Sequence, residues 1–365
     1  MFDCSVVGYI LGMTPAPTLS ERPTVFPLFD HEQVNISTGK RSGLTIIVAV
    51  HSTKLGPALG GCRVWSYDSW GEAAADALRL SRGMTSKNAL AGLPLGGGKS
   101  VIVLAPGQQL TGELRRQAFL DLGDAVEALG GSYLTAEDVG TTAADMAVVA
   151  ELTAHAVGLP ADQGGLGDPG EYTARGVYSA LRETLRRTHG TAETAGRKIT
   201  IVGLGQVGSA LATRLAGEGA ELTLSDINDA KQELARELGA AWVSPADAHR
   251  VPADVFMPAG VGGMLSPRVI DELDTRAVVG PANNQLAEAD GAEQLAARGI
   301  LYAPDYLLNA GGVIYLGAEG DTIDERIARI DAIGETLGSV FDEAERSGVT
   351  TVAAADTLVN ALLAK

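Results

Sequence analysis

The sequence predicts an α/β protein of two domains, the second of which is a doubly wound parallel sheet. The chain has 365 residues, a length at which two domains are more common than one. After Lys198, short apolar strands alternate with helical segments, which is typical of βαβ units. A polar, glycine-rich stretch over residues 162–170 separates the two halves. We therefore expect one domain over residues 1–160 and the other over residues 161–347.

In the first half, apolar runs of strand length predict strands over residues 45–51, 100–104 and 133–139. Apolar or small side chains recur at helical spacing between these runs. They predict helices over residues 72–82, 113–129 and 143–156.

In the second half, a helix is expected to lead into the alternating elements over residues 173–188. Strands are predicted over residues 198–202, 221–225, 255–257, 277–279 and 299–302. Helices are predicted between and after them over residues 206–215, 230–238, 289–297, 324–347 and 352–363.

The charge of the chain excludes several classes of partner. Lys plus Arg number 28 and Asp plus Glu number 45, so the formal net charge is −17. Nucleic acid and anionic membrane surfaces require clustered positive charge, so we expect neither as a partner. No run of about 18 apolar residues predicts a membrane span, and the segment Met1–Pro17 lacks the basic start of a signal peptide. We expect a cytoplasmic protein.

The cysteine content excludes two kinds of structural site. Cys4 and Cys62 are the only cysteines of the chain. Two thiols cannot form a disulfide framework or a thiolate zinc site, so we expect no structural metal.

Glycine is over-represented, with 46 residues. Gly203, Gly205 and Gly208 form a G-x-G-x-x-G pattern, with Gln206 and Val207 inside it, between an apolar strand and a helix. The first glycine permits a tight turn, the second lets a pyrophosphate approach backbone N–H groups, and the third lets helix and strand pack closely. Glycines that serve packing alone are the alternative. The context favours a Rossmann dinucleotide-binding domain.

Asp226 follows the next predicted strand, 18 residues after the last glycine of the pattern (226 − 208). This is the place of the carboxylate that contacts the ribose hydroxyls of the adenosine. A negative charge there repels a 2′-phosphate, and no arginine follows directly. NAD is therefore favoured over NADP.

Three charged residues of the first half are candidates for catalysis. Lys99 follows three glycines, but Leu93 stands where a phosphate-binding P-loop needs glycine. The lysine is either an amine in a tight pocket, with a lowered pKa, or an exposed loop residue. Lys87 either binds an anion or ends a helix in solvent. Asp138 either transfers protons at a strand end or caps a turn.

Two groups of asparagines follow predicted strands of the second domain. Asn283, Asn284 and Asn309 offer amides to a nicotinamide or a carboxylate, or they serve turns, which asparagine also favours.

Seven segments of the chain match one known family together, and in its order. They are residues 55–63 (LGPALGGCR), 83–88 (GMTSKN), 94–100 (PLGGGKS), 136–139 (AEDV), 203–208 (GLGQVG), 282–286 (ANNQL) and 302–312 (YAPDYLLNAGG). The chain thus resembles the amino acid dehydrogenases of the glutamate, leucine, phenylalanine and valine group, and most closely the leucine, valine and phenylalanine enzymes.

The resemblance implies a role for each matching residue. Lys99 would be the catalytic base that activates water, Lys87 would hold the substrate carboxylate, and Asp138 would handle protons on the amino group. Backbone N–H groups of Gly60 and Gly61 would meet the substrate. Residues expected beside the nicotinamide or substrate are Thr173, Asn283, Asn284 and Asn309.

The resemblance also implies the architecture. The N-terminal α/β domain would bind substrate and form the oligomer, a dimer or larger, and the last helix, at about residues 348–365, would pack back on it. The reaction would take place between this substrate domain and the Rossmann domain. It would convert an L-amino acid and NAD to a 2-oxo acid and ammonium, or the reverse.

The resemblance places five apolar residues around the substrate side chain: Leu59, Met84, Ala136, Val313 and Leu316. This lining favours leucine, valine or isoleucine over glutamate. Phenylalanine or tryptophan dehydrogenase is the alternative within the family. A 2-hydroxy-acid dehydrogenase would need a histidine–carboxylate pair that the sequence does not indicate. A catalytically silent NAD-binding regulator is the alternative from another class.

Overall fold

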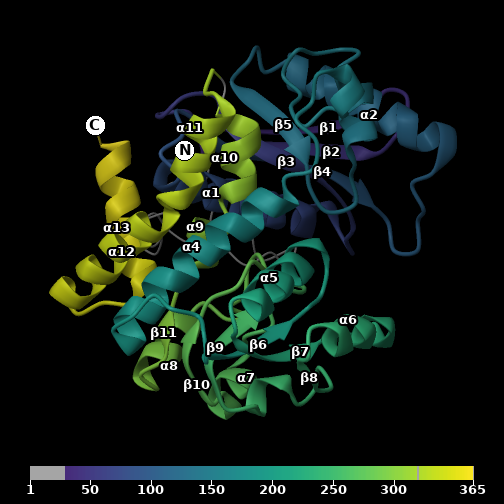
Figure 1. Cartoon of the computed structure of the whole chain (residues 1–365). Coiled ribbons are helices and arrows are strands. Elements are labelled where there is room, and N and C mark those ends of the chain that lie inside the picture. Colours follow the sequence, from purple (N-terminus) through teal and green to yellow (C-terminus); the bar gives the residue numbers. More distant parts are fainter. Residues whose placement is uncertain (1–28, 319, 365) are drawn as a thin grey trace, which may run out of the picture. The chain divides into compact units, whose positions relative to one another are not determined.

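A computed structural model describes residues 29–318 and 320–364. The chain divides into two units, residues 1–30 and residues 31–365. The expectations for Met1–Pro17 and for Cys4 lie outside the described residues. The paragraphs below concern the second unit, which contains two β-sheets (Figure 1).

The first sheet has five strands and mixed direction. Its strands are β1 (Gln33–Thr38), β2 (Thr45–Ser52), β3 (Ala58–Ser66), β4 (Gly96–Leu104) and β5 (Tyr133–Glu137), in the order β1-β2-β4-β3-β5. Neighbours β1, β2 and β4 pair antiparallel, whereas β3 runs parallel to both β4 and β5. The carboxyl ends of β3, β4 and β5 therefore lie at the same edge of the sheet.

Helices cover both faces of this sheet, and each face has its own core. On one face α1 (Trp70–Leu90) packs Ala73 and Ala77 on Ile47 and Val101. On the other face lie α2 (Gly112–Glu127) and α3 (Ala143–Val149), in a separate cluster of buried side chains that includes Cys62 and Tyr133. Burial on both faces explains why β2 is an unbroken apolar run.

The second sheet has six strands, all parallel (Figure 1). Its strands are β6 (Lys198–Val202), β7 (Glu221–Ser225), β8 (Ala241–Trp242), β9 (Ala253–Pro258), β10 (Thr275–Val278) and β11 (Leu301–Tyr302), in the order β11-β10-β9-β6-β7-β8. The helices along these strands are α5 (Gln206–Gly217), α6 (Gln232–Glu237), α7 (Pro267–Glu272) and α8 (Gly291–Ala297). The strand order reverses at β6, where such sheets bind ligands. This confirms the predicted α/β fold class.

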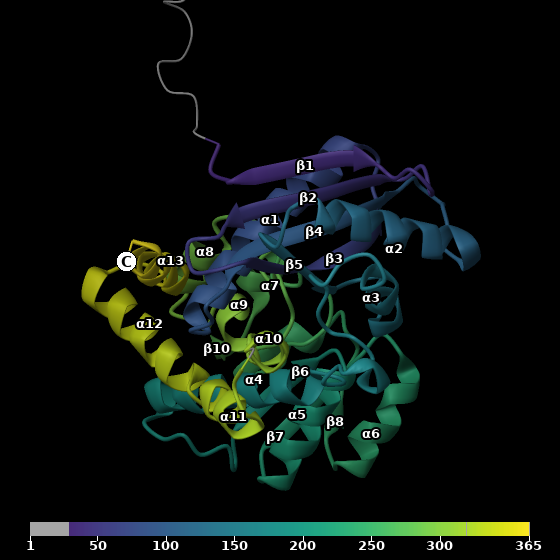
Figure 2. The ribbon, with the colours of Figure 1, turned by 90° about the horizontal axis from the view of Figure 1, so that it is seen from above.

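The chain runs between the two sheets twice. It leaves the first sheet through α4 (Gly170–His189) and returns through five helices. These are α9 (Asp305–Leu308), α10 (Gly311–Gly317), α11 (Ile323–Asp331), α12 (Ile333–Ser347) and α13 (Thr351–Leu363). Helix α4 contacts α10, α11 and α12, and α13 contacts α1 of the first half. Figure 2 shows α12 and α13 next to each other at the C-terminal end of this return path.

The structure corrects several element predictions. Lys99 is not in a loop, because the three glycines before it already belong to β4, and Lys87 lies inside α1 rather than after it. The helix predicted over residues 324–347 is two helices that meet at Ala332, and the helix that begins at Ala143 ends at Val149. Strands β1, β3 and β8 and helices α7, α9 and α10 were not predicted.

Gly97 allows the close contact of α1 with β4. A Cβ atom at this position would lie 2.1 Å from the backbone nitrogen of Thr85, where no carbon fits. A Cβ atom at Gly83, on the same helix, would meet nothing within 4 Å.

We expect Gly97→Ala to lower the free energy of unfolding by about 3 kcal/mol, because it overpacks the contact between helix and strand. Gly83→Ala is the control and should raise that free energy by about 0.5–1 kcal/mol, since alanine favours the helix. Urea denaturation measures both. Equal stability of the two variants would contradict this account of Gly97.

Candidate active site

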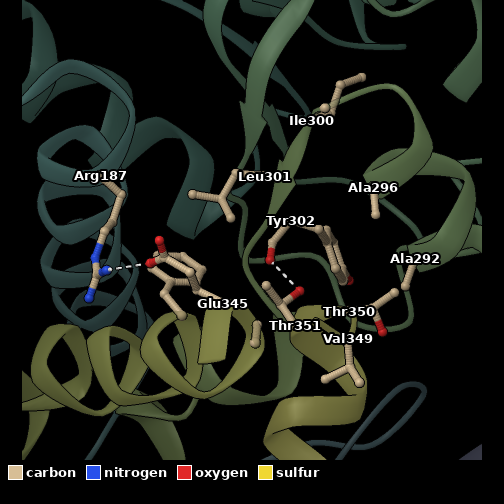
Figure 3. Close-up of a pocket in the computed structure, with 13 residues that line it drawn as sticks. Arg187, Ala292, Ala296, Ile300, Leu301, Tyr302, Glu345, Val349, Thr350 and Thr351 are labelled. Atoms are coloured by element: carbon tan, nitrogen blue, oxygen red, sulfur yellow. Dashed lines mark hydrogen bonds and ion pairs between the residues drawn. The ribbon is translucent and has the colours of Figure 1, made fainter. Parts of the chain in front are cut away.

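A cavity of about 390 Å³ that was not predicted lies at the far edge of the second sheet (Figure 3). β11, α8 and the junction of α12 and α13 contribute to its wall. Polar groups that line it interact with one another: Arg187 lies 3.9 Å from Glu345, and the Thr351 hydroxyl donates a hydrogen bond to the Tyr302 carbonyl oxygen. None of the predicted site residues lines it.

A second cavity, of about 450 Å³, collects most of the predicted site residues from both halves of the chain. Predicted residues that line it are Leu59, Gly60, Gly61, Met84, Lys87, Lys99, Ala136, Asp138, Thr173, Gly205, Gln206, Val207, Asn283, Asn309, Val313 and Leu316. We take this cavity as the candidate active site.

Four predicted residues do not line this cavity: Gly203, Gly208, Asp226 and Asn284. Asn284 has a left-handed backbone, with φ of 52°, beside Asn283, which does line the cavity. Eight lining residues were not predicted: Glu137, Val157, Pro169, Ala259, Gly260, Pro281, Ala282 and Gly312.

The charged centre of the cavity is a cluster of Lys99, Asp138 and Arg63. Nζ of Lys99 lies 2.9 Å from Oδ1 of Asp138, and Nε of Arg63 lies 3.0 Å from Oδ2 of the same carboxylate. Each carboxylate oxygen therefore has its own cation. Only 5% of the Lys99 side chain and 18% of the Asp138 side chain are exposed, so the pair is held largely away from water.

Strand register explains why these residues meet. β3 lies between β4 and β5, and Gly61 of β3 is paired with Ala136 of β5. Lys99, Arg63 and Asp138 point to the face covered by α1, because side chains alternate along each strand. A Cβ atom at Gly61 would lie 2.8 Å from Cβ of Asp138, so glycine there leaves room for the carboxylate beside the lysine.

The surroundings shift the pKa values of the charged pair in opposite ways. Burial lowers the pKa of Lys99 below its usual 10.5, and the positive charge of Arg63 lowers it further, whereas Asp138 raises it. Burial opposes ionisation of Asp138, but Lys99 and Arg63 outweigh it and hold the pKa of this carboxyl at about 2. Asp138 is thus an anion at any ordinary pH, and Lys99 is the member of the pair whose pKa is shifted toward neutral pH.

Lys87 reaches from α1 to the second half of the chain. Its Nζ donates a 3.3 Å hydrogen bond to Oδ1 of Asn283, and the same oxygen accepts a 2.7 Å hydrogen bond from Nδ2 of Asn309. Burial lowers the pKa of Lys87 to about 8, although the buried carboxylate of Asp305 acts against the shift. Asp305 and Arg63 were not predicted as site residues, although they stand in the matching segments 302–312 and 55–63.

The residues present fit a dinucleotide cofactor. Gly203 has φ of 107°, and a Cβ atom on Gly208 would lie 2.0 Å from the Gly203 carbonyl oxygen, so the turn between β6 and α5 requires glycine at both positions. Gly205 is the N-cap of α5, and a Cβ atom there would meet nothing within 4 Å, which leaves the helix N-terminus open to a phosphate. Oδ1 of Asn309 is buried without a hydrogen-bond partner and is available to an amide N–H.

Asp226 lies at the end of β7, beside this turn. Its carboxylate accepts hydrogen bonds from the backbone N–H groups of Leu204, at 2.5 Å, and Asn228, at 2.8 Å. It therefore ties the first and second β–α turns of the sheet together. The residue after Asp226 is the exposed Ile227, so no basic side chain directly follows the carboxylate.

The chain matches the family model of the Glu/Leu/Phe/Val dehydrogenase dimerisation domain over residues 29–155, and the model described as glutamate/leucine/phenylalanine/valine dehydrogenase over residues 223–356. The chain belongs to the glutamate/leucine/phenylalanine/valine dehydrogenase family. It is thus an amino acid dehydrogenase, and the family to which it belongs uses NAD(P) and forms oligomers.

Curated relatives cover almost the whole chain. Leucine dehydrogenase of Bacillus cereus is 40% identical over 339 residues, which is 92% of each chain. Leucine dehydrogenase of Geobacillus stearothermophilus is 41% identical over 90% of each chain. Valine dehydrogenase of Streptomyces coelicolor is 40% identical over 92% of this chain and 93% of its own.

Among solved structures, L-tryptophan dehydrogenase from Nostoc punctiforme superposes with a TM-score of 0.79 at 34% identity, over 92% of this chain and 96% of that one. Within residues 29–318 and 320–364, no helix is long and apolar enough to span a membrane.

We expect Asp138→Asn to move the rise of kcat with pH to lower pH by about one unit, because the variant loses the negative charge that raises the pKa of Lys99. The kcat profile reports the enzyme–substrate complex and so excludes titration of the free amino acid. A profile that stays in place or moves to higher pH would contradict the assignment of the titrating group to Lys99.

Proposed function

We propose that this chain catalyses the NAD-dependent oxidative deamination of a branched-chain L-amino acid to the 2-oxo acid and ammonium, and the reverse reductive amination. Leucine, valine and isoleucine are the favoured substrates. The observation that carries the proposal is that one cavity is lined by two lysines, by an aspartate that is paired with one of them, and by a set of apolar side chains.

The proposed substrate orientation follows from the charges. Lys87 would pair with the substrate carboxylate, which would take the place that the Asn283 amide oxygen has on this ammonium. The carboxylate would then place Cα near Lys99 and Asp138. The negative Asp138 would also attract the ammonium form of the substrate.

The proposed chemistry rests on Lys99 in its neutral form. The substrate ammonium would first lose a proton to water, and bound NAD would then accept the hydride that leaves the substrate Cα. Lys99 would take a proton from the water that attacks the resulting imine carbon, and the product of that addition would lose ammonia to give the 2-oxo acid. Burial of Lys99 supports this role, because it lowers the pKa of the amine toward the working range of a base.

The apolar lining supports a branched-chain substrate. Ala136, Val313 and Leu316 line the cavity with Leu59 and Met84, and Val157 adds a further apolar wall. A glutamate side chain would bring a charge into this lining, at a cost of several kcal/mol. The leucine and valine dehydrogenases among the relatives support the same substrate class.

The proposed assembly is a homo-oligomer in the cytoplasm. Support for the oligomer comes from the match to the dimerisation domain over residues 29–155.

A spectrophotometric assay of NADH formation across the common L-amino acids tests the proposed activity. We expect the highest kcat/KM for leucine, valine or isoleucine. Lys99→Ala, which measures the background rate of NADH formation, should lose activity by about 10³-fold or more. Higher kcat/KM for phenylalanine or tryptophan would refute the substrate preference. NADH binding without turnover of any amino acid would identify a regulator instead.

We expect Asp226→Asn to raise kcat/KM with NADP by about fivefold, because it removes a charge that repels the 2′-phosphate at a cost of about 1 kcal/mol. The amide oxygen still accepts the hydrogen bond from Leu204, whereas the hydrogen bond from Asn228 to the other carboxylate oxygen is lost. The same assay with NAD is the control and should change less. An unchanged ratio of NAD to NADP activity would show that Asp226 does not select the cofactor.

A further inference from the structure

Arg63 is the charged residue of the centre to which neither the family motifs nor the proposed chemistry assigns a role. It lies in β3 and its side chain is 16% exposed. Its guanidinium bridges two carboxylates: Nε lies 3.0 Å from Oδ2 of Asp138, and Nη1 lies 3.0 Å from Oδ2 of Asp76. Arg63 thus connects α1, which carries Asp76, with Asp138, which directly follows β5.

The second carboxylate is itself well held. The Tyr67 hydroxyl donates a 2.7 Å hydrogen bond to Oδ2 of Asp76, and Nη2 of Arg79 lies 2.6 Å from Oδ1. Asp76 therefore holds Arg63 from a fixed point on α1. The guanidinium in turn presents Nε to Asp138 in one orientation.

This arrangement matters when Lys99 loses its proton. Lys99 must give up its proton before it can act as a base. In a site with little water, a lysine and a carboxylate alone would share that proton, and Asp138 would take it. A cation that cannot be deprotonated, on the other oxygen of the same carboxylate, prevents this. Arginine meets the condition, and a second lysine would not.

We propose that Arg63 is a positioning residue of the reaction, which keeps Asp138 oriented and negatively charged while Lys99 gives up and regains its proton. The proton is then exchanged with substrate or water rather than with the aspartate. This inference rests on the proposed role of Lys99 as base.

The other charged groups near the pair do not replace Arg63. Lys87 approaches Lys99 from α1 and acts on it as a second positive charge. Cys62, on the opposite face of β3, is buried with its pKa raised to about 12, so it stays a neutral thiol. On that opposite face Asp145 is paired with Arg115, at 2.6 Å.

The test is Arg63→Met, which removes the charge and keeps much of the side chain's volume. Asp76 retains Tyr67 and Arg79, and Asp138 retains Lys99, so neither carboxylate loses its last partner. We expect the rise of kcat with pH to move to higher pH by about one unit, because a charge that lowers the pKa of Lys99 is lost. This is opposite to the shift expected for Asp138→Asn. We also expect the plateau of kcat to fall about tenfold.

Arg79→Met is the matched control. This arginine pairs with the same Asp76, but its side chain is 53% exposed and it does not contact Asp138. Its kcat profile should match that of the wild type within twofold. Asp76→Asn tests a purely structural role: if Arg63 only tied α1 to the sheet, this variant and Arg63→Met would lose stability alike, with no shift of the pH profile.

Arg63→Lys keeps the test decisive if the methionine variant does not fold. The lysine retains the positive charge, but its single ammonium group cannot bridge Asp138 and Asp76 as the planar guanidinium does. We expect its pH profile to stay in place while kcat falls about tenfold. Wild-type kcat in Arg63→Lys, or an unmoved profile in a folded Arg63→Met, would overturn the inference.

A measurement without turnover separates this inference from the proposed function. The rate at which acetic anhydride labels Lys99, followed by peptide mass spectrometry over a range of pH, reports the pKa of the lysine directly. Arg63→Met should move the midpoint of labelling to higher pH by about one unit. Wild-type protein without amino acid turnover would refute the function, whereas equal midpoints in both proteins would refute the role of Arg63.

Discussion

The ion pair between Lys99 and Asp138 is the interaction on which the arrangement of the cavity depends. Taking a lysine ammonium out of water costs several kcal/mol, and the cost is offset only if a carboxylate meets it in good geometry. That geometry arises because β3 separates β4 from β5 and carries glycine at position 61, so that no side chain stands between the two charges. Removing Asp138 would leave the Lys99 ammonium buried without a carboxylate, whereas removing Lys99 would leave Asp138 with Arg63 as its remaining partner.

The second sheet contributes to the cavity through backbone more than through charge. Its parallel strand order reverses at β6, which brings the turn before α5 to the cavity wall, where Gly205, Gln206 and Val207 lie. Gly203 and Gly208 stand behind this wall and let the turn approach the loop after β9. The two sets of glycines therefore have different roles. Gly205, at the wall, leaves space for a ligand, whereas Gly203 and Gly208, behind the wall, allow the close packing of the turn.

Most of the cavity could be predicted from the sequence, because its residues stand in short segments with distinct spacing. Lys99, Asp138 and the glycine pattern belong to such segments; Lys99 lies inside β4, whereas Asp138 and the glycine pattern follow the ends of β5 and β6. The strands that place them were predicted less well. β3 was missed because Gly60 and Gly61 interrupt its apolar run, and without β3 the register that points Arg63 at Asp138 cannot be worked out. The break at Ala332 stands two residues before Gly334, and the Ser179 hydroxyl contacts the backbone on both sides of it, which the sequence does not indicate.

The double passage of the chain between the sheets has a mechanical consequence. A single linker would leave one sheet free to twist and swing about the other in any direction. Here α4 leads out of the first half, and α13 closes the return path against α1. Two separate connections restrict the relative motion of the two sheets to rotation about an axis that passes near both connections. This constraint also acts on Lys87 and Asn283, which come from different halves of the chain and meet in the cavity.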